Sequence, residues 1–338
     1  MIYPWLSDIW RTLLAQRERT HHALLLHGPA GIGKSRLAAE LTRAWLCESP
    51  EAGGEACGRC ASCGWVAHDN HPDLRVLAPM TEEPSEAATE GTTRTARATP
   101  STDIRIDQVR ALERFVGVGG HRGGCKIVRI DPADALNVAA ANALLKTLEE
   151  PAAGTRFLLV THRPDALPAT IRSRCFAVGF SLPATDAAVD WLVSETGAER
   201  TQAAGWLAAA GGAPLRARGF ADPAAASTHR MLVETLASLP ETSVVRAADA
   251  LNGIEPSLWV GTLQSWIADL QRCRAGAQPR FFPERTARLR ALSEATSLRA
   301  LDRLASEIAT LARAVDHPLN PRLMIEDALI RVRTALAG

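Results

Sequence analysis

"HALLLHGPAGIGKS", residues 22–35, joins a short apolar run to a glycine-rich turn and the start of a helical pattern. The turn satisfies the spacing G-x-x-x-x-G-K-[ST] of a phosphate loop. Glycines allow successive backbone N–H groups to surround phosphates, while the helix N-terminus, the lysine and the serine serve the phosphate oxygens and magnesium. A chance match, or a relic loop that no longer binds, is the alternative interpretation. The candidate nucleotide-binding residues here are Gly28, Gly31, Gly33, Lys34 and Ser35.

The regions around this loop alternate between short apolar runs and helical patterns. Runs at 22–28, 74–78, 125–130 and 156–160 are strand candidates, and 105–115 and 138–149 have helical patterns. Strands that are apolar throughout and alternate with helices predict a parallel sheet covered on both faces.

"KIVRIDPADAL", residues 126–136, resembles the second half of an ATPase site. Asp131 follows an apolar strand and is a candidate partner of magnesium, although Asp followed by Pro is also typical of a helix cap. Pro132 occupies the usual place of a catalytic Glu, and losing a general base typically costs about 10² to 10⁴ in rate. Asp134 is expected on the solvated surface of a helix. The sequence therefore favours nucleotide binding without turnover.

Cys47, Cys57, Cys60 and Cys63 have the spacing C-x9-C-x2-C-x2-C. Four thiolates can close a tetrahedral zinc site, and the short gaps let neighbouring ligands converge. A C-x-x-C redox pair is the alternative, but it expects a thioredoxin-like setting that this sequence lacks. The pattern predicts a structural zinc module over residues 47–64.

Other cysteines and histidines are weaker candidates. His68 or His71 could replace one ligand, but "NHPDLRVL" is more typical of a turn that enters a strand. Cys125 and Cys273 are expected to be ordinary buried thiols.

The composition limits the possible classes of function. The 338 residues carry a net charge of +1, with 46% hydrophobic and 22% charged residues, as in ordinary globular domains. No apolar run reaches membrane-spanning length, and "MIYPWLSDIWRTL" has no basic region or cleavage site of a signal peptide, so we expect a cytoplasmic protein without membrane contact. Residues 81–102 are predicted to form a disordered insertion. After about residue 181 the pattern is helical, with apolar stripes that predict packed helices.

"TIRSRC", residues 170–175, places two arginines close together. A surface arginine in a local ion pair is the favoured interpretation from spacing alone. The alternative is that Arg174 reaches the ATP of a neighbouring subunit as an arginine finger, which is worth about 10³ to 10⁵ in kcat.

Several of these stretches together resemble one family. "HHALLLHGPAGIGKS", the four-cysteine insertion, "HPDL", "NALLKTLEEP", "FLLVTHRPDALPATIRSRC", "NPRLMIEDALIRV" and the opening "YPWL" are similar to delta-prime subunits of the bacterial DNA polymerase III clamp loader, within the AAA+ clamp-loader family. The resemblance covers most of the chain and is thin between about 185 and 310.

The resemblance implies an AAA+ domain with an embedded zinc module (1–180), a helical lid (181–226) and a helical collar for ring assembly (227–338). It implies that Arg174 is the finger acting in trans, and that Thr161 and Arg216 occupy two sensor positions. The implied partners are the gamma/tau and delta subunits, with the sliding clamp and primer–template DNA reached through the complex. Delta-prime members often lack a working phosphate loop, whereas this sequence retains the loop and has Pro132, so binding of ATP and magnesium stays open.

Two other functions remain as alternatives. An autonomous ATPase motor, either gamma-like or a remodeller of DNA junctions, would be expected to carry Asp-Glu where this chain has Asp131–Pro132. A zinc-dependent nucleic-acid-binding protein would need basic residues around the cysteines, and "ACGRCASCGW" contains one Arg.

Overall fold

The computed structural model describes residues 2–17, 19–79, 103–117, 125–313 and 320–336. The chain divides into two compact units, Met1–Leu182 and Pro183–Gly338. The insertion predicted at 81–102 lies outside the described residues.

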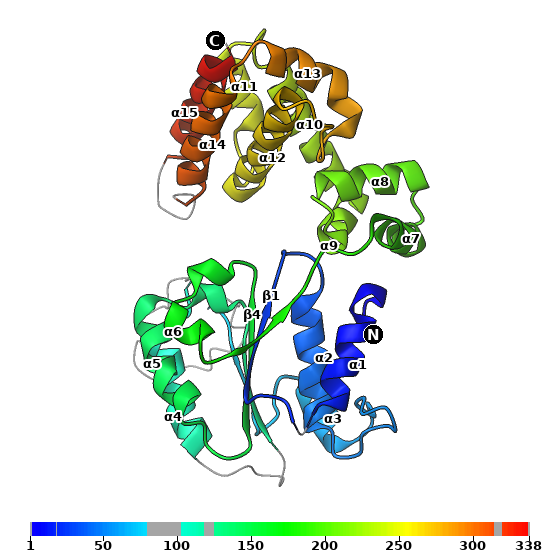
Figure 1. Cartoon of the computed structure of the whole chain (residues 1–338), viewed down its shortest axis with the longest axis vertical. Coiled ribbons are helices and arrows are strands. Elements are labelled where there is room, and N and C mark those ends of the chain that lie inside the picture. The colour runs from blue at the N-terminus through cyan, green and yellow to red at the C-terminus, as the bar shows by residue number, and fades with distance from the viewer. Residues whose placement is uncertain (1, 18, 80–102, 118–124, 314–319, 337–338) are drawn as a thin grey trace, which may run out of the picture. The chain divides into compact units, whose positions relative to one another are not determined.

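The first unit is built on a parallel sheet (Figure 1). In its described part, five strands lie in the order β2-β3-β4-β1-β5. Four of them confirm the apolar runs found in the sequence, and β5 was missed because its four residues are mostly exposed. The strands are β1 (Ala23–His27), β2 (Leu74–Leu77), β3 (Lys126–Ile130), β4 (Thr155–Thr161) and β5 (Phe176–Gly179).

Helices cover both faces of this sheet, with α1, α2 and α3 on one side and α4, α5 and α6 on the other (Figure 1). The predicted helices at 105–115 and 138–149 are confirmed as α4 and α5. Asn137 begins α5, since its side chain accepts a hydrogen bond from the Ala140 N–H at 2.8 Å. The helices are α1 (Ser7–Ala15), α2 (Lys34–Leu46), α3 (Ala61–Ala67), α4 (Ile106–Gly117), α5 (Val138–Glu149) and α6 (Ala169–Arg172), with short 3-10 turns η1 (Pro4–Leu6), η2 (Ala133–Ala135) and η3 (Pro164–Ala166).

The register of the sheet brings several strand ends together. His27, the last residue of β1, pairs with Thr161, the last residue of β4, and β3 lies on the other side of β4. Because parallel strands share one carboxyl edge, the segments that follow β1, β3 and β4 meet there. This edge holds the phosphate loop.

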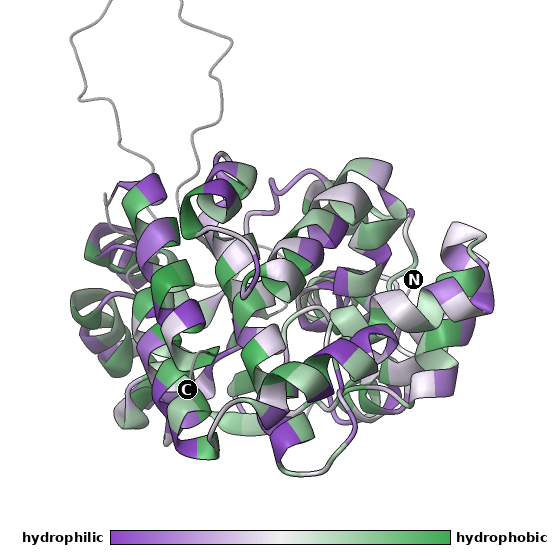
Figure 2. Ribbon diagram, turned by 90° about the horizontal axis from the view of Figure 1, so that it is seen from above, coloured by the Kyte–Doolittle hydropathy of each residue, from purple (hydrophilic) through white to green (hydrophobic). Residues whose placement is uncertain are grey.

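The described part of the second unit is helical, with two hydrophobic clusters. One lies among the helices that begin the unit. The other is built around α12, in which Trp259, Leu263, Trp266 and Leu270 are buried, as expected of packed helices. Figure 2 shows hydrophobic and hydrophilic residues alternating along single helices, as packing on one face requires. The helices are α7 (Thr185–Thr196), α8 (Arg200–Ala209), α9 (Pro214–Arg218), α10 (Pro223–Ser238), α11 (Val244–Leu251), α12 (Pro256–Arg274), α13 (Thr286–Glu294), α14 (Leu298–Arg313) and α15 (Pro321–Leu336), with 3-10 turns η4 (Gly219–Ala221) and η5 (Pro283–Arg285).

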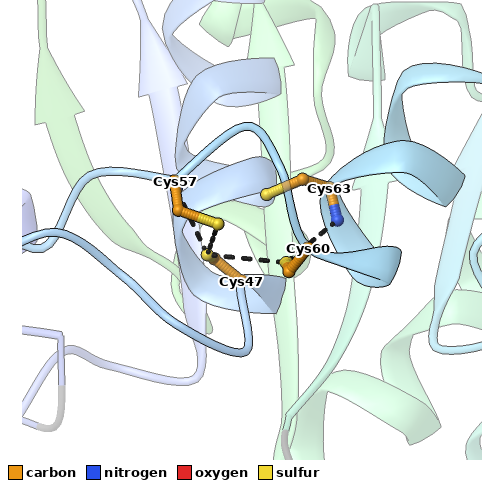
Figure 3. Close-up of side chains that lie close together, drawn as sticks. All are labelled: Cys47, Cys57, Cys60 and Cys63. Carbon is orange, nitrogen blue, oxygen red and sulfur yellow. Dashed lines mark hydrogen bonds between the residues drawn. The ribbon is translucent and has the colours of Figure 1, made fainter.

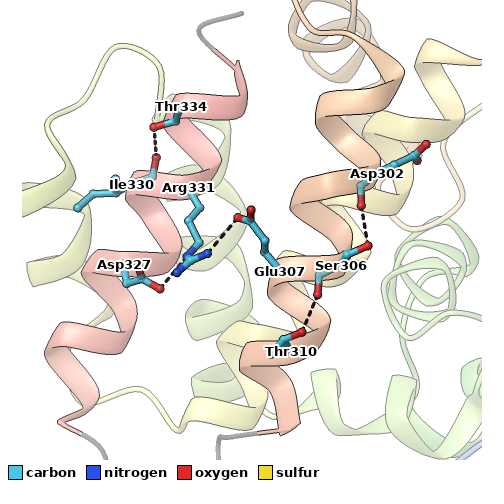
Figure 4. A network of polar contacts seen from close by, with 8 residues as sticks. All are labelled: Asp302, Ser306, Glu307, Thr310, Asp327, Ile330, Arg331 and Thr334. Carbon is cyan, nitrogen blue, oxygen red and sulfur yellow. Dashed lines mark hydrogen bonds and ion pairs between the residues drawn. The ribbon is translucent and has the colours of Figure 1, made fainter.

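Polar contacts fix the last helices against one another. Arg331 of α15 contacts Asp327 on its own helix at 2.8 Å and Glu307 of α14 at 3.1 Å (Figure 4). Among the described residues, no helix is long and apolar enough to cross a membrane.

Candidate functional site

The phosphate loop connects β1 to α2, and its glycines are required by close neighbours. A Cβ on Gly28 would lie 2.3 Å from the carbonyl oxygen of Phe180, which follows β5. Gly33 has φ +95°, and a Cβ there would lie 2.5 Å from the ring of Tyr3. At both positions a side chain would clash with its neighbour, and the left-handed backbone of Gly33 adds strain. The structure therefore requires glycine at both positions of the loop.

Lys34 is buried beneath this loop. Its Nζ donates hydrogen bonds to the carbonyl oxygens of Gly28 at 2.8 Å and Pro29 at 2.6 Å. Burial lowers the pKa of the ammonium to about 8, although nearby Asp131 and Asp134 act in the opposite direction. The Lys34 ammonium is therefore poorly solvated, and the two carbonyl oxygens contact it where a phosphate oxygen could bind.

Asp131 lies beside the start of α2. The Ser35 hydroxyl donates to Asp131 Oδ1 at 3.1 Å, although the two residues are far apart in the sequence. Burial raises the pKa of this carboxyl, and the bond from Ser35 acts against that shift. Pro132, rather than Asp131, precedes η2 as its N-cap, so the helix-cap interpretation of Asp131 is wrong. The hydroxyl and carboxylate that magnesium would need lie together.

Asp134 is not on a solvated surface, contrary to the expectation from the sequence. Only 5% of its side chain is exposed, because η2 turns it toward the end of β4. Its Oδ1 accepts from the Thr161 hydroxyl at 2.8 Å and the His162 N–H at 3.2 Å, and its Oδ2 accepts from Arg163 Nε at 3.1 Å. Burial alone would raise the pKa of Asp134, but these hydrogen bonds outweigh burial and lower it.

The hydroxyl of Thr161, a predicted sensor, both donates and accepts a hydrogen bond within the chain. Its hydroxyl donates to Asp134 and accepts from the Arg163 N–H at 3.1 Å. Arg216, the other predicted sensor, is an exposed residue of α9 in the second unit, and its role stays a prediction.

The opening segment of the chain packs on the phosphate loop, which sequence reasoning missed. Trp5 Nε1 donates to the Ile32 carbonyl at 2.9 Å, and the rings of Tyr3 and Trp5 stack. The aromatic pair in "YPWL" was noticed in the sequence only as part of the family resemblance, and it did not predict a contact with the phosphate loop.

The four predicted cysteines converge at the end of α2 and the start of α3 (Figure 3). Their sulfur atoms all lie within 4.8 Å of one another, with Cys47 at 3.5 Å from Cys57 and 3.9 Å from Cys60. Tetrahedral thiolates about 2.3 Å from zinc would lie about 3.8 Å apart, so the donor set fits that metal. The Cys57 N–H donates to Cys47 Sγ, and the Cys63 N–H donates to Cys60 Sγ, which favours thiolates. The cluster has metal-binding geometry.

A buried hydrogen-bonded chain anchors this cluster to the sheet. The Ser62 hydroxyl donates to the Leu46 carbonyl at 2.5 Å and lies 2.7 Å from His71 Nε2, while His71 Nδ1 accepts from the Asp73 N–H at 3.0 Å. Leu46 and Ser62 directly precede two of the cysteines. His71 therefore holds the cluster from outside, and His68 instead contacts the Gly64 carbonyl.

The remaining cysteines form no disulfide. Cys273 is buried as expected, whereas Cys125 is half-buried, with its sulfur 3.6 Å from the Trp45 carbonyl oxygen. Burial raises the pKa of both thiols.

Arg174 and Arg172 both form local ion pairs. Arg174 pairs with Glu149 and donates to the Thr170 carbonyl at 3.0 Å, and Arg172 pairs with Asp165 at 3.1 Å. β5 begins at Phe176 opposite Leu24, four residues before Gly28, and four residues span about 13 Å along a strand. Arg174 thus lies toward the opposite edge of the sheet from the phosphate loop of its own chain.

Comparison with known proteins identifies the family. Residues 6–183 match the family model described as DNA polymerase III, delta subunit, and residues 228–334 match the model of its C-terminal region. The chain is 39% identical over 269 residues to DNA polymerase III subunit delta′ of Pseudomonas aeruginosa, covering 79% of this chain and 75% of that protein. The chain belongs to the delta-prime subunit family of the DNA polymerase III clamp loader.

One further relative and one solved structure are also similar to this chain. The Escherichia coli delta′ subunit is 37% identical over 195 residues, which is 57% of this chain and 53% of that subunit. A gamma-subunit-related protein of Thermotoga maritima has a solved structure with 18% identity, a TM-score of 0.41 and coverage of 98% of this chain and 99% of its own. The structure confirms the predicted fold class, a parallel α/β domain with a four-cysteine cluster followed by helices.

Proposed function

We propose that this delta-prime family member is a stator of the clamp loader, which helps its neighbours load the sliding clamp onto primed DNA. It would assemble in the cytoplasm with the gamma/tau and delta subunits and reach DNA and clamp through them. We assign residues 1–180 to the AAA+ domain, 181–226 to the lid and 227–338 to the collar. Matches to both family models support this role.

The observation that carries the proposal is the pairing of an intact phosphate loop with Pro132. Lys34, Ser35 and Asp131 supply the cation, hydroxyl and carboxylate that ATP and magnesium would use. Pro132 has no proton acceptor, and Asp134 is a poor substitute because both its oxygens are engaged and its pKa is lowered. Thr161 is also engaged with Asp134. The chain binds ATP but does not turn it over alone.

Arg174 acts on the ATP of a neighbouring subunit. The register of β5 separates it from the phosphate loop of its own chain, and a third of its side chain is exposed. A guanidinium at this position would stabilise charge on the transferring phosphoryl group, which arises only in the assembled ring.

The four cysteines hold one structural zinc. Cys47, Cys57, Cys60 and Cys63 would supply four thiolates, leaving no open position for catalysis. The metal would join the end of α2 to α3 and so stabilise the first unit.

The finger role is tested in the reconstituted clamp loader. Arg174→Ala should fold and assemble normally but lose part of the ATPase that DNA and clamp stimulate, because one of several ATP sites lacks its arginine. Arg172→Ala, with its own ion pair to Asp165, is the matched control and should lose much less. Equal behaviour of the two variants would overturn the role.

Nucleotide binding is tested on the isolated chain. We expect ATP to bind by calorimetry, with no steady-state ATPase and no binding by Lys34→Ala. A robust ATPase that Lys34→Ala abolishes would instead support the autonomous motor, which the intact phosphate loop keeps as the second candidate.

A further inference from the structure

The side chain of Arg174 is held by a residue that the resemblance does not assign. Its Nη2 forms an ion pair with Glu149, and its Nη1 donates to the Thr170 carbonyl at 3.0 Å and the Ser173 hydroxyl at 3.3 Å. Glu149 is the last residue of α5, and α6 with the turn after it carries the other residues (Figure 1). The guanidinium is thus fixed from two sides.

The contact leaves part of the guanidinium available. Glu149 contacts one terminal nitrogen instead of forming the two-point fork that carboxylates make with Nε and Nη2. Arg174 Nε is buried and has no hydrogen-bond partner in the described part of the chain. Although Nε itself is closed to solvent, 34% of the side chain as a whole is exposed, so a neighbouring molecule can contact its exposed part.

The charge of Glu149 is unfavourable for its own helix. A carboxylate in the last turn lies near the negative end of the helix dipole, where cations are preferred. The guanidinium of Arg174 supplies that cation. The pairing therefore stabilises the end of α5 as well as the arginine.

We propose that Glu149 is a positioning residue that presets Arg174 for the nucleotide of the neighbouring subunit, an inference that rests on the proposed finger role. An arginine side chain has large rotamer freedom, and fixing it beforehand lowers the entropic cost of reaching a transition state. A half-exposed ion pair is weak, so a triphosphate with several negative charges displaces the carboxylate easily. The gain from orienting the Arg174 guanidinium therefore outweighs the small cost of breaking its ion pair with Glu149.

The ATPase of the reconstituted clamp loader tests this role. Glu149→Ala should lower the Arg174-dependent part of the stimulated kcat about threefold with little change in KM. Glu149→Gln keeps an acceptor for Nη2 and should retain most activity. Glu150→Gln, next along the chain, is the matched control and should behave as wild type. In an Arg174→Ala background, Glu149→Ala should have no further effect.

A second measurement reads the geometry in the isolated full chain. The Nε–H signal of Arg174 in NMR relaxation, identified by its loss in Arg174→Lys, should be ordered in wild type and Glu149→Gln and mobile in Glu149→Ala. Suppose that Arg174→Ala lowers the ATPase. If Glu149→Ala then raised the ATPase, or left both the ATPase and the Nε–H order unchanged, the positioning role would be overturned and the finger role would stand. If Arg174→Ala had no effect on the ATPase, both would be overturned.

Discussion

Replacing Lys34 by methionine is expected to stabilise the first unit at neutral pH, although it removes the cation that we propose binds phosphate. The residue is only 2% exposed, and burial lowers the pKa of its ammonium from 10.5 to about 8. That difference corresponds to about 3 kcal/mol of unfolding free energy, at about 1.4 kcal/mol per pKa unit. Methionine forfeits the hydrogen bonds to Gly28 and Pro29, worth about 1 kcal/mol each, so a net gain of about 1 kcal/mol should remain.

The sign of the pH dependence follows from the lowered pKa. Below pH 8 both folded and unfolded chains are protonated at Lys34, so the wild type carries the full penalty. Between pH 8 and 10.5 the unfolded chain binds the proton that the folded chain has released, and wild-type stability rises with pH. The extra unfolding free energy of Lys34→Met over wild type should therefore shrink, and then change sign, as the pH rises through this window.

Urea denaturation followed by circular dichroism at several pH values between 7 and 10 measures this difference, with the two units fitted as separate transitions. Lys146→Met, at an exposed position of α5, is the control and should show no such pH dependence. A lower urea midpoint for Lys34→Met at pH 7, or a difference from wild type that stays constant up to pH 10, would refute the reasoning.

Three further predictions concern the four-cysteine cluster, the Ser62–His71 contact beside it, and Asp134. Cys60→Ser should bind less than one zinc per chain and lose several kcal/mol of unfolding free energy. Elemental analysis measures the zinc, with Cys125→Ser as control. A full equivalent of zinc in Cys60→Ser would contradict the prediction. Ser62→Ala removes the hydroxyl between His71 and a carbonyl and should cost about 1–3 kcal/mol, which an unchanged urea midpoint would disprove. The pKa of Asp134 is lower in the folded chain than its value near 3.8 in the unfolded chain. Ionised Asp134 therefore stabilises the fold at pH values above 3.8, and this stabilisation is lost as the pH falls through the folded pKa. The advantage of wild type over Asp134→Asn in urea should therefore be constant near neutral pH and shrink as the pH falls below about 4, and an advantage that stays constant at acid pH would rule this out.

Local spacing was enough to predict the phosphate loop and the cysteine cluster. Lys34 and Ser35 follow the glycines in one turn, and the cysteines lie within seventeen residues, so chain geometry alone brings them near. The apolar strands were also predictable, because parallel strands buried on both faces carry continuous apolar runs. The edge strand β5 escaped detection because Phe176 and its neighbours are exposed.

Features that depend on tertiary register were not predictable. Asp134 was expected to follow helical periodicity away from the site, but η2 directs its carboxylate to Thr161 on another strand. The contact of Tyr3 with Gly33 joins segments that no local pattern connects. The distance of Arg174 from its own phosphate loop follows from the pairing of β5 with β1, which the sequence does not reveal.

The packing of the opening segment on the phosphate loop gives this chain a built-in spectroscopic reporter. Tyr3 is the single tyrosine in the sequence, and its ring lies 5.1 Å from that of Trp5, with only 4° between the ring planes. Every phenol signal of the protein, in ultraviolet difference absorbance, resonance Raman or fluorotyrosine spectra, therefore originates beside Gly33. Changes at the phosphate loop can therefore be followed in the intact chain without adding a dye, and fluorotyrosine in this chain alone would keep the signal specific in the presence of other proteins.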